Sequence, residues 1–415
     1  MEEGSWLMIK ATRRQVLGAA AALALTPLAG GCALGTRQGP LVGMEYETWF
    51  TCAMGGAPSV AAVLREAGNK RAALNAQGAA GADLGAPHLA LSLAAASQVA
   101  NDVDGRCPVR PAAGWAGREA TPVLGTYESS DPTVIRQHAE WISGAGVDFL
   151  LIDWSNNFGG NWSNGVALGI MAATYNLVLQ YRKLRQRPRF ALLLGLDDHQ
   201  AGTADFQQLV DTIWTLFLEP ADLRPLYQEY LGKPLLGVFT GPRFTGPPTW
   251  SDPRFTVRWV NGFNETTHGN RMGYWSWIDR RPQITYRQQT GSQGLRPVAE
   301  AVTVAAGFPG GGPSSQHGWG SEGARRHGQT YLDQWAVAFS ARPEVVLLCQ
   351  WNEFNQPDQY SVELSNDMEP TQASGWGAHG QGGWGTYYLD LTRKMVEAFK
   401  AGRPQPKVTL DPSMP

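Results

Sequence analysis

Acidic side chains recur in this chain at the ends of apolar, strand-like runs. The clearest example is Glu353, which follows a nearly all-apolar run and stands in the segment Gln-Trp-Asn-Glu-Phe-Asn. Other run ends carry Glu45, Glu47, Asp153 and Asp197. Two carboxyl groups can hydrolyse a glycosidic bond, because one protonates the leaving oxygen while the other acts as nucleophile or base. Indole rings, also frequent at these ends, offer a sugar a flat apolar face and one hydrogen-bond donor.

The elements that must position these side chains follow one repeating order. Apolar runs alternate with amphipathic helical stretches, which is typical of parallel βα units. Strands are predicted at residues 41–50, 122–127, 147–154, 189–196, 235–240, 301–306 and 345–353, with one more at either 256–261 or 273–278. Helices are predicted at residues 131–145, 164–186, 203–217, 222–231, 329–341 and 388–400. The predicted fold class is therefore α/β, a single (β/α)8 TIM-type barrel with long βα loops and an insertion after the first strand.

Length and composition agree with one large domain. The chain has 415 residues, and a barrel with insertions takes roughly 250 to 400. The net charge of -2 provides no basic surface, so no nucleic-acid partner is expected. No Gly-x-Ser-x-Gly segment of a serine hydrolase is present in the sequence. We expect residues 32–40 to be a linker, 41–405 to be the barrel with its insertion at 52–120, and 406–415 to be a tail.

The first 31 residues have the pattern of an export signal. A twin-arginine segment at residues 12–17 leads into an apolar stretch that ends at Leu28, and Cys32 follows. The stretch is shorter than the roughly 20 residues that a membrane-spanning helix needs. We therefore expect export, either as a periplasmic protein or as a lipoprotein anchored to the membrane through a lipidated Cys32.

The remaining cysteines give no metal-site spacing. Cys52 and Cys107 flank the insertion, and they form either a disulfide, which an oxidising compartment permits, or two unpaired thiols. Cys349 lies within an apolar run, so we expect it to be a buried small hydrophobe.

Two segments near the C-terminus resemble a known motif. Gln-Trp-Asn-Glu-Phe at 350–354, followed by Asp-Met-Glu-Pro at 367–370, is similar to the last-strand motif of the glycoside hydrolase family 71/99-like clan. The clan includes endo-α-mannosidases and endo-mannanases, and its motif is roughly Phe-Asn-Glu-Trp-His-Glu and then Ile-Glu-Pro. Residues 145–154 resemble the clan's third strand, and residues 45–50 resemble its first strand more weakly. The resemblance implies a distant member of this clan, with a (β/α)8 barrel, glycosidase activity and a carbohydrate substrate.

The resemblance also implies roles for residues of the last loop. The clan's catalytic pair is two glutamates separated by two residues. The first matches Glu353, which would assist attack by the sugar's own 2-hydroxyl and give retention through an anhydro-sugar. The second falls on Gln356, and a glutamine cannot donate a proton as an acid does.

The identity of the general acid therefore has three competing explanations. The longer loop of this chain supplies Glu363 or Glu369, which is the explanation we favour. Alternatively, an acid at another strand end, such as Glu47 or Asp153, takes the role. The third explanation is a non-catalytic carbohydrate-binding lipoprotein of the same fold. The oxygen side chains within 360–370 also suit a calcium site as an alternative to a catalytic role.

All these side chains are expected at the C-terminal strand ends, where (β/α)8 barrels carry their active sites. The predicted catalytic residues are Glu353, Glu363 and Glu369. The predicted substrate-binding residues are Glu45, Tyr46, Glu47, Trp49, Tyr127, Asp153, Trp154, Asp197, Trp275, Trp277, Trp351, Asn352 and Gln356. No cofactor and no metal ion are expected.

Overall fold

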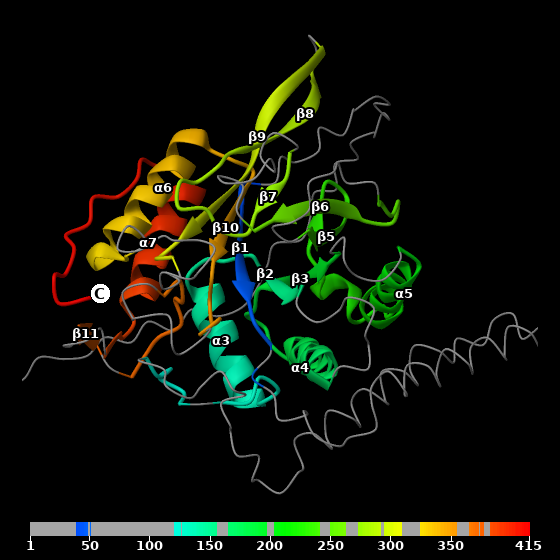
Figure 1. The fold of residues 1–415 in the computed structure, drawn as a ribbon, viewed down its shortest axis with the longest axis horizontal. Coiled ribbons are helices and arrows are strands. Elements are labelled where there is room, and N and C mark those ends of the chain that lie inside the picture. The colour runs from blue at the N-terminus through cyan, green and yellow to red at the C-terminus, as the bar shows by residue number, and fades with distance from the viewer. Residues whose placement is uncertain are drawn as a thin grey trace, which may run out of the picture. The chain divides into compact units, whose positions relative to one another are not determined.

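One mostly parallel, ten-stranded sheet runs through the described part of the chain (Figure 1). This computed structural model describes residues 39–48, 50, 120–125, 127–155, 165–196, 203–240, 250–262, 273–291, 294–308, 324–354, 365–372, 374–376 and 382–415. The strands follow the order β7-β6-β5-β3-β2-β1-β10-β9-β8 along the sheet, and β4 pairs with β5. Their bounds are β1 Leu41–Tyr46, β2 Phe149–Trp154, β3 Arg189–Gly195, β4 Glu229–Tyr230, β5 Lys233–Phe239, β6 Thr256–Asn261, β7 Trp275–Ser276, β8 Thr285–Gly291, β9 Gly294–Ala305 and β10 Val345–Cys349.

The parallel strands close on themselves. All strands of the sheet except β4 and β8 pair in parallel with a neighbour. The two strands at the ends of this parallel set, β7 and β9, contact each other. The hydroxyl of Thr303 in β9 donates a hydrogen bond to the carbonyl of Ser276 in β7. The sheet is therefore a nearly closed eight-stranded barrel, which confirms the predicted α/β class and (β/α)8 TIM-type fold.

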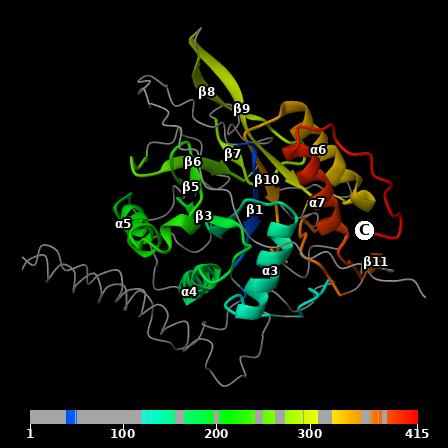
Figure 2. The same ribbon diagram turned by 180° about the vertical axis from the view of Figure 1, so that it is seen from behind.

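In the described part of the chain, helices lie on the outside of the barrel, four of them between consecutive barrel strands and α7 after the last strand. They are α3 Pro132–Gly144, α4 Gly165–Tyr181, α5 Thr203–Ile213, α6 Gln329–Ala341 and α7 Tyr387–Lys400. Helix α3 contacts both α4 and α7 and lies between them (Figure 2). It begins where the Asp131 side chain accepts a hydrogen bond from Thr133 N at 2.7 Å, and Pro132 fits the first helical position. Its apolar stripe and His138 are buried against the barrel.

Two predicted elements are wrong, and the ambiguous one is resolved. Residues 122–125 form a turn with a single bridge from Pro122 to Thr371, so no second strand lies there. Both β6 and β7 belong to the barrel, whereas only one of them was predicted to. The additional strand takes the place of the one predicted at residues 122–127. Residues 222–231 do not form one helix, because only Arg224–Leu226 is helical, as a single 3-10 turn, and the chain then enters β4. Leu231 and Gly232, both with positive φ, turn the chain from β4 into β5.

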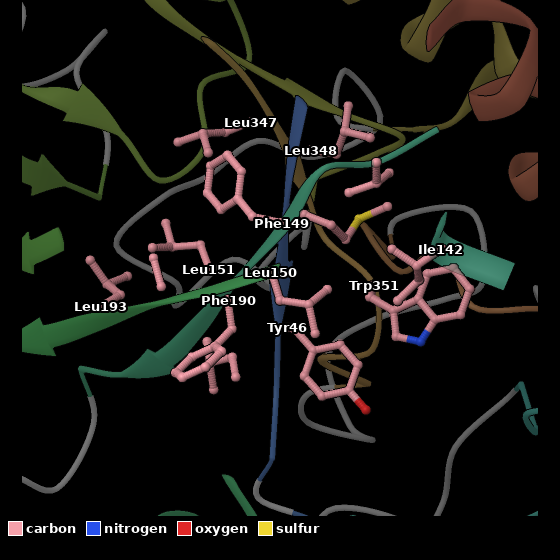
Figure 3. Close-up of a cluster of buried hydrophobic side chains, with 14 of the residues drawn as sticks. Tyr46, Ile142, Phe149, Leu150, Leu151, Phe190, Leu193, Leu347, Leu348 and Trp351 are labelled. Carbon is pink, nitrogen blue, oxygen red and sulfur yellow. The ribbon is translucent and has the colours of Figure 1, made fainter. Parts of the chain in front are cut away.

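Alternate strand side chains fill the barrel. Gly43 pairs with Phe149, and a Cβ at position 43 would lie 2.4 Å from the Phe149 ring. Glycine is therefore required here, since the ring occupies the space a side chain would take. Leu151 and Leu347 belong to the same buried cluster (Figure 3). Because Glu45 is paired with Leu151, its carboxyl group lies on the same sheet face as these apolar side chains.

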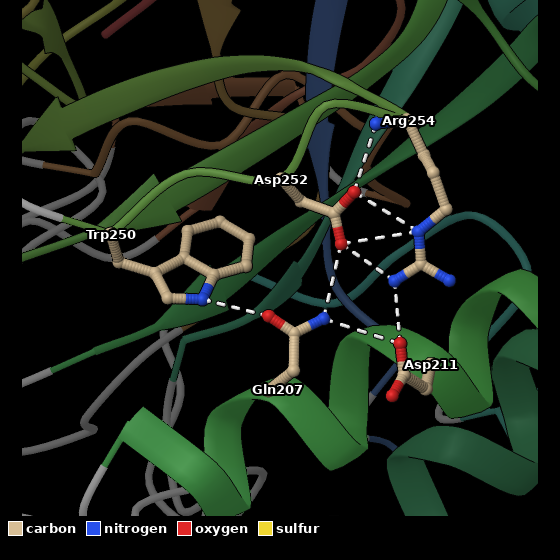
Figure 4. A network of polar contacts seen from close by, with 5 residues as sticks. All are labelled: Gln207, Asp211, Trp250, Asp252 and Arg254. Carbon is tan, nitrogen blue, oxygen red and sulfur yellow. Dashed lines mark hydrogen bonds and ion pairs between the residues drawn. The ribbon is translucent and has the colours of Figure 1, made fainter.

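A polar network outside the barrel holds α5 against the segment that enters β6 (Figure 4). Gln207 accepts a hydrogen bond from Trp250 at 3.1 Å and donates to Asp252 at 3.1 Å. Arg254 pairs with Asp252 at 2.6 Å and with Asp211 at 2.5 Å. Burial opposes ionisation of Asp252, but the hydrogen bonds from Arg254 lower its pKa to about 2. This network stabilises the scaffold and lies apart from the strand ends that carry the candidate site.

Several predicted features fall outside the described residues. They are the export signal at 1–31, the insertion at 52–120, and Cys52 and Cys107 with their disulfide or free thiols. Among the helices of the described part, none is long and apolar enough to cross a membrane.

Candidate active site

Three neighbouring strands bring four carboxyl groups to the C-terminal end of the barrel. Glu45 and Glu47 lie at the end of β1, Asp153 lies in β2, and Glu353 follows β10. The order β2-β1-β10 makes these strands adjacent. Each of the four carboxyl groups has an electrostatic interaction with at least one of the others. The grouping predicted from the strand ends is thus present, and we call these four residues the carboxylate cluster.

Glu45 is the deepest member of the carboxylate cluster. Its side chain is fully buried, and its hydrogen-bonding neighbour is the thiol of Cys349, which is only a weak donor. Burial raises the pKa of Glu45 well above its usual range. The nearby thiol of Cys349 opposes this rise, whereas the charges of Asp153 and Glu353 add to it. Glu45 therefore holds a proton at pH values where an exposed glutamate is ionised.

Glu47 and Asp153 form an asymmetric pair. Burial, followed by the charges of Asp153 and Glu353, raises the pKa of Glu47 well above its usual range. Burial also raises the pKa of Asp153, but hydrogen bonds from Ser155 and from Glu47 limit the rise. The backbone N–H of Ser155 donates to Asp153 Oδ1 at 2.5 Å. The proton of the pair accordingly resides on Glu47, which donates it to Asp153 in a hydrogen bond.

Glu353 differs from the other three because it is only half-buried. The amide of Asn366 donates a hydrogen bond to Glu353 Oε2 at 3.0 Å and also contacts the Cys349 sulfur at 3.4 Å. A donated amide hydrogen bond favours the ionised carboxylate. The cluster therefore combines buried carboxyl groups whose pKa is raised with one that lies nearer to solvent and accepts an amide hydrogen bond, and such a difference in surroundings can separate an acid from a base.

The segment from Asn366 to Pro370 backs the turn that carries Glu353. Met368 N and Glu369 N donate to the Trp351 carbonyl at 3.1 and 2.9 Å. The Asp367 carboxylate accepts the Phe354 N–H at 2.8 Å. These bonds fix the backbone on both sides of Glu353. The Asp-Met-Glu-Pro motif thus supports the site through these hydrogen bonds.

Arg325 anchors the same segment from behind. Its buried guanidinium lies between the rings of Trp384 and Tyr388, at 4.1 and 4.4 Å from their centroids. It donates a hydrogen bond to the Asp367 carbonyl at 2.7 Å. A planar guanidinium can be buried in this way because aromatic faces attract a cation.

Glu369 does not face the carboxylate cluster. It is fully buried, its Oε1 lies 3.0 Å from His138 Nε2, and its Oε2 accepts the Tyr127 hydroxyl at 2.7 Å. Tyr127 in turn accepts a hydrogen bond from Asn352 at 3.0 Å. Both oxygens of Glu369 are therefore occupied by groups behind the strand ends. The other predicted residues of this loop, Glu363 and Gln356, lie outside the described residues, as do Trp49 and Asp197.

Most of the predicted aromatic side chains point to the helix layer and not to the cluster. The Tyr46 hydroxyl bonds to His138 of α3, and the Trp154 indole donates to Thr174 of α4 at 2.9 Å. The Trp351 ring lies 6.3 Å from that of Trp141 in α3. These rings are buried core, because strand residues alternate between the barrel interior and the helices.

Trp277 is a predicted indole that lies just beyond the C-terminal end of β7. It is half-buried, and its ring centroid lies 6.5 Å from that of Phe239 at the end of β5. It also packs against the buried group that contains Cys349. Trp275, by contrast, is buried and packs against Tyr230 at 6.0 Å. Trp277 and Phe239 together form an aromatic pair at the C-terminal ends of β7 and β5.

Sequence reasoning missed four residues that shape the site: Phe239, His138, Asn366 and Cys349 as a neighbour of Glu45. Phe239 ends β5, so the strand-end rule could have identified it. His138 interrupts the apolar stripe of a predicted helix, which signals a buried polar contact. No local pattern distinguishes Asn366, because its contact with Glu353 depends on how the segment folds back.

The calcium alternative finds no support among the described residues. Asp367 Oδ1 accepts the Phe354 N–H and its Oδ2 accepts the Ser365 hydroxyl at 2.6 Å, while Glu369 is occupied as described. Across the described ranges, no group of three His, Cys, Asp or Glu side chains is arranged to hold a metal ion.

The fold and the carboxylate cluster together define a (β/α)8 barrel with an acidic centre at its C-terminal end. No protein-family model and no curated protein matches the chain. Two solved structures of a GH99 endo-α-mannosidase from Bacteroides thetaiotaomicron are similar to it, one in complex with bis-tris-propane. They share 14% and 15% identity with TM-scores of 0.47 and 0.48, and each match covers 69% of this chain and 85% or 90% of the other.

A third solved structure, of a glycoside hydrolase-like protein, is 11% identical with a TM-score of 0.39. That match covers 67% of this chain and 89% of the other. The first two structures belong to the enzyme group that the motif at 350–354 and 367–370 resembles. At these identities and TM-scores the fold assignment rests on the strand order and pairing of this chain.

Proposed function

We propose that the protein is a glycoside hydrolase that cleaves O-glycosidic bonds in a polysaccharide or glycan. The observation that carries the proposal is the contrast between two neighbouring carboxyl groups at the barrel end. Glu47 is buried with a raised pKa and holds a proton, whereas Glu353 is half-buried and accepts an amide hydrogen bond. A protonated and an ionised carboxyl group are the two reagents that glycosidic hydrolysis requires.

In the proposed mechanism, Glu47 donates its proton to the oxygen of the leaving sugar as the bond from that oxygen to the anomeric carbon breaks. An oxygen nucleophile bonds to the anomeric carbon, and Glu353 accepts the proton that this nucleophile loses. Asp153 holds Glu47 in the protonated, hydrogen-bonded geometry before each turnover. Trp277 and Phe239 would stack on the sugar ring.

This assignment changes the favoured source of the general acid. Of the two residues first considered, Glu369 is occupied by His138 and Tyr127, so it has no oxygen directed at the site. Glu47, the acid from another strand end, has the raised pKa and the neighbouring carboxylate that an acid needs.

A test uses the purified full chain and a panel of polysaccharides and glycans. We expect release of reducing ends from at least one substrate, with loss of that release in Glu47→Gln and Glu353→Gln variants that remain folded. A retained rate in Glu47→Gln would remove Glu47 as the acid. Loss of the rate in Glu353→Gln alone would then point back to the loop at 355–364.

The second candidate is a carbohydrate-binding protein of the same fold without activity. It is favoured by Gln356, because the clan that this chain resembles has its catalytic acid at the matching position. Binding of one glycan by the wild-type chain with no release of reducing ends from any would establish this candidate instead.

We further propose export through the twin-arginine segment, followed by residence in the periplasm or anchoring through Cys32. Cell fractionation of wild type, of a chain with Arg13 and Arg14 both changed to Lys, and of Cys32→Ser tests both steps. Export predicts that the double variant stays in the cytoplasm. Anchoring predicts that Cys32→Ser leaves the membrane fraction.

A further inference from the structure

A chain of buried side chains leads from helix α3 to the backbone of Glu47. His138 Nε2 lies 3.0 Å from Glu369, and the Tyr127 hydroxyl donates to Glu369 at 2.7 Å. Asn352 Nδ2 donates to the Tyr127 oxygen at 3.0 Å. His138, Glu369, Tyr127 and Asn352 are all buried. We call these four residues the buried relay.

Asn352 connects the buried relay to Glu47 at two points. Its Oδ1 accepts the Glu47 N–H at 2.9 Å, and its Nδ2 donates to the Glu47 carbonyl at 3.0 Å. β1 ends at Tyr46, so Glu47 is the first residue beyond the strand. The side chain of Asn352 therefore binds both the N–H and the carbonyl of Glu47, as a neighbouring strand would, and so fixes the Glu47 backbone.

The donors and acceptors of the buried relay are matched along its length. As a carboxylate, Glu369 can accept from His138 and from Tyr127 at once. Tyr127 donates its hydroxyl proton to Glu369 and accepts from Asn352 with its oxygen, which fixes the orientation of the Asn352 amide. Burial, followed by the charge of Glu369, raises the pKa of Tyr127 well above its usual range, so the hydroxyl stays a donor. Each group has one orientation that satisfies its neighbours.

We propose that Tyr127 and Glu369 are positioning residues that act on Glu47 through Asn352, and that the buried relay keeps the Glu47 carboxyl group beside Asp153. The inference rests on the proposed function of Glu47 as the acid. Without the Tyr127 hydroxyl, the Asn352 amide loses one acceptor and can rotate, and its two bonds to the Glu47 backbone weaken together. A displaced Glu47 would be less desolvated, so its pKa would fall.

The decisive variant is Tyr127→Phe, which removes one hydroxyl and keeps the ring. We expect kcat to fall roughly 10- to 100-fold with KM nearly unchanged, because a small misplacement of a catalytic group has costs of that order. The alkaline limb of the pH–rate profile should also move to lower pH. A purely structural role for Tyr127 would lower stability without moving that limb.

The matched control is Tyr331→Phe. Tyr331 is also fully buried, and its hydroxyl bonds to Thr392 at 2.8 Å between α6 and α7. It has no contact with the buried relay, so kcat and the pH–rate profile should equal those of wild type. Equal kcat and pH–rate profiles in Tyr127→Phe and Tyr331→Phe would overturn the proposal.

Glu369→Gln separates positioning from catalysis. A glutamine can still accept from Tyr127 with its oxygen and donate to His138, provided that the His138 proton moves to Nδ1 and bonds to the Tyr46 hydroxyl. We therefore expect a loss smaller than that in Tyr127→Phe. A catalytic acid at this position would instead lose about 10²–10⁴-fold, and such a loss would overturn the proposal.

The two proposals fail in different ways. Absence of turnover by the wild-type chain on every glycan removes the proposed function. The positioning of Glu47 is then read from the protonated-carboxyl band in difference infrared spectra across a pH titration, with Glu47→Gln identifying the band. A lower titration midpoint in Tyr127→Phe than in Tyr331→Phe supports the buried relay, and equal midpoints overturn it.

Discussion

The two ends of the barrel give their carboxyl groups opposite surroundings. At the N-terminal end, Glu300 pairs with Arg258 at 2.6 Å and Glu344 pairs with Arg287 at 2.5 Å. The Tyr230 hydroxyl lies within hydrogen-bond distance of both glutamates, at 3.2 and 2.7 Å, and shares its single proton between them. At the C-terminal end, the neighbours of the buried Glu45 carboxyl group are the weakly donating thiol of Cys349 and the carboxyl groups of Asp153 and Glu353.

The difference separates stability from function. A buried carboxyl group without a donor costs free energy, whereas a paired one is at least compensated. The N-terminal end shows that this fold can supply arginine and tyrosine partners where a carboxyl group serves the scaffold. Desolvated acids with raised pKa values, collected at the other end, are the arrangement expected where carboxyl pKa values are adjusted for chemistry.

The largest contrast between the two ends should appear in Glu353→Gln and Glu344→Gln. Glu353→Gln should lower kcat by about 10²–10⁴-fold, the usual range for loss of a general base or acid. Glu344→Gln removes a carboxylate from the paired end and should leave kcat per folded molecule unchanged. Steady-state kinetics on the substrate found in the glycan panel measures both. Comparable losses in the two variants would show that the ends do not divide stability from function.

Glu300→Ala tests the paired end directly. Arg258 is about one-fifth exposed and would lose its partner, with Glu300 itself only 3% exposed. Breaking such a buried pair from one side should lower the free energy of unfolding by about 3–5 kcal/mol. Urea unfolding followed by circular dichroism measures the loss. A change below about 1 kcal/mol, the range of surface pairs, would show that this end is not the stabilising one.

Glu45, at the C-terminal end of the barrel, should make stability depend on pH in a specific direction. Because the folded-state pKa of Glu45 is raised, the folded chain binds more protons than the unfolded chain between the ordinary pKa and the raised one. The contribution of Glu45 to the free energy of unfolding is therefore lost as pH rises through this window. Urea midpoints at a series of pH values should fall less steeply with pH in Glu45→Gln than in wild type. Identical slopes would contradict the raised pKa.

The smallest effect is expected for Lys400→Met, which tests whether every pair at the N-terminal end is strong. Lys400 bonds to Asp148 at 2.6 Å, but the two side chains are 29% and 31% exposed. Water and salt screen such a pair, so the loss of stability should stay below about 1 kcal/mol. Urea unfolding at low and high salt measures it. A loss as large as that of Glu300→Ala would mean that burial does not rank these pairs.

Local sequence patterns predicted most of the scaffold. Helix α3 was predictable because Asp131 and Pro132 start it and its apolar residues recur with helical spacing. The apolar run that became β2 was predictable from its length and composition alone. Residues 122–127 were misassigned, because a short apolar stretch carries little periodicity and its partner, Thr371, lies far along the chain.

The site divides in the same way. Glu45, Glu47, Asp153 and Glu353 were predicted as a group, because parallel strands in a barrel end on one face. Glu369 was predicted to be a candidate acid, yet its environment could not be read from its neighbours in sequence. The histidine that occupies it is 231 positions away.

The sequence by itself thus determined the order of strands and helices and the acids at the strand ends, since both depend on residue type and local spacing. Tertiary structure decided which acids are protonated, which are paired and which side chains hold them. Desolvation and hydrogen-bond partners set those properties, and segments distant in the chain supply them. Glu369 and Glu47 are both buried glutamates, and only their folded surroundings distinguish the one that supports from the one proposed to react.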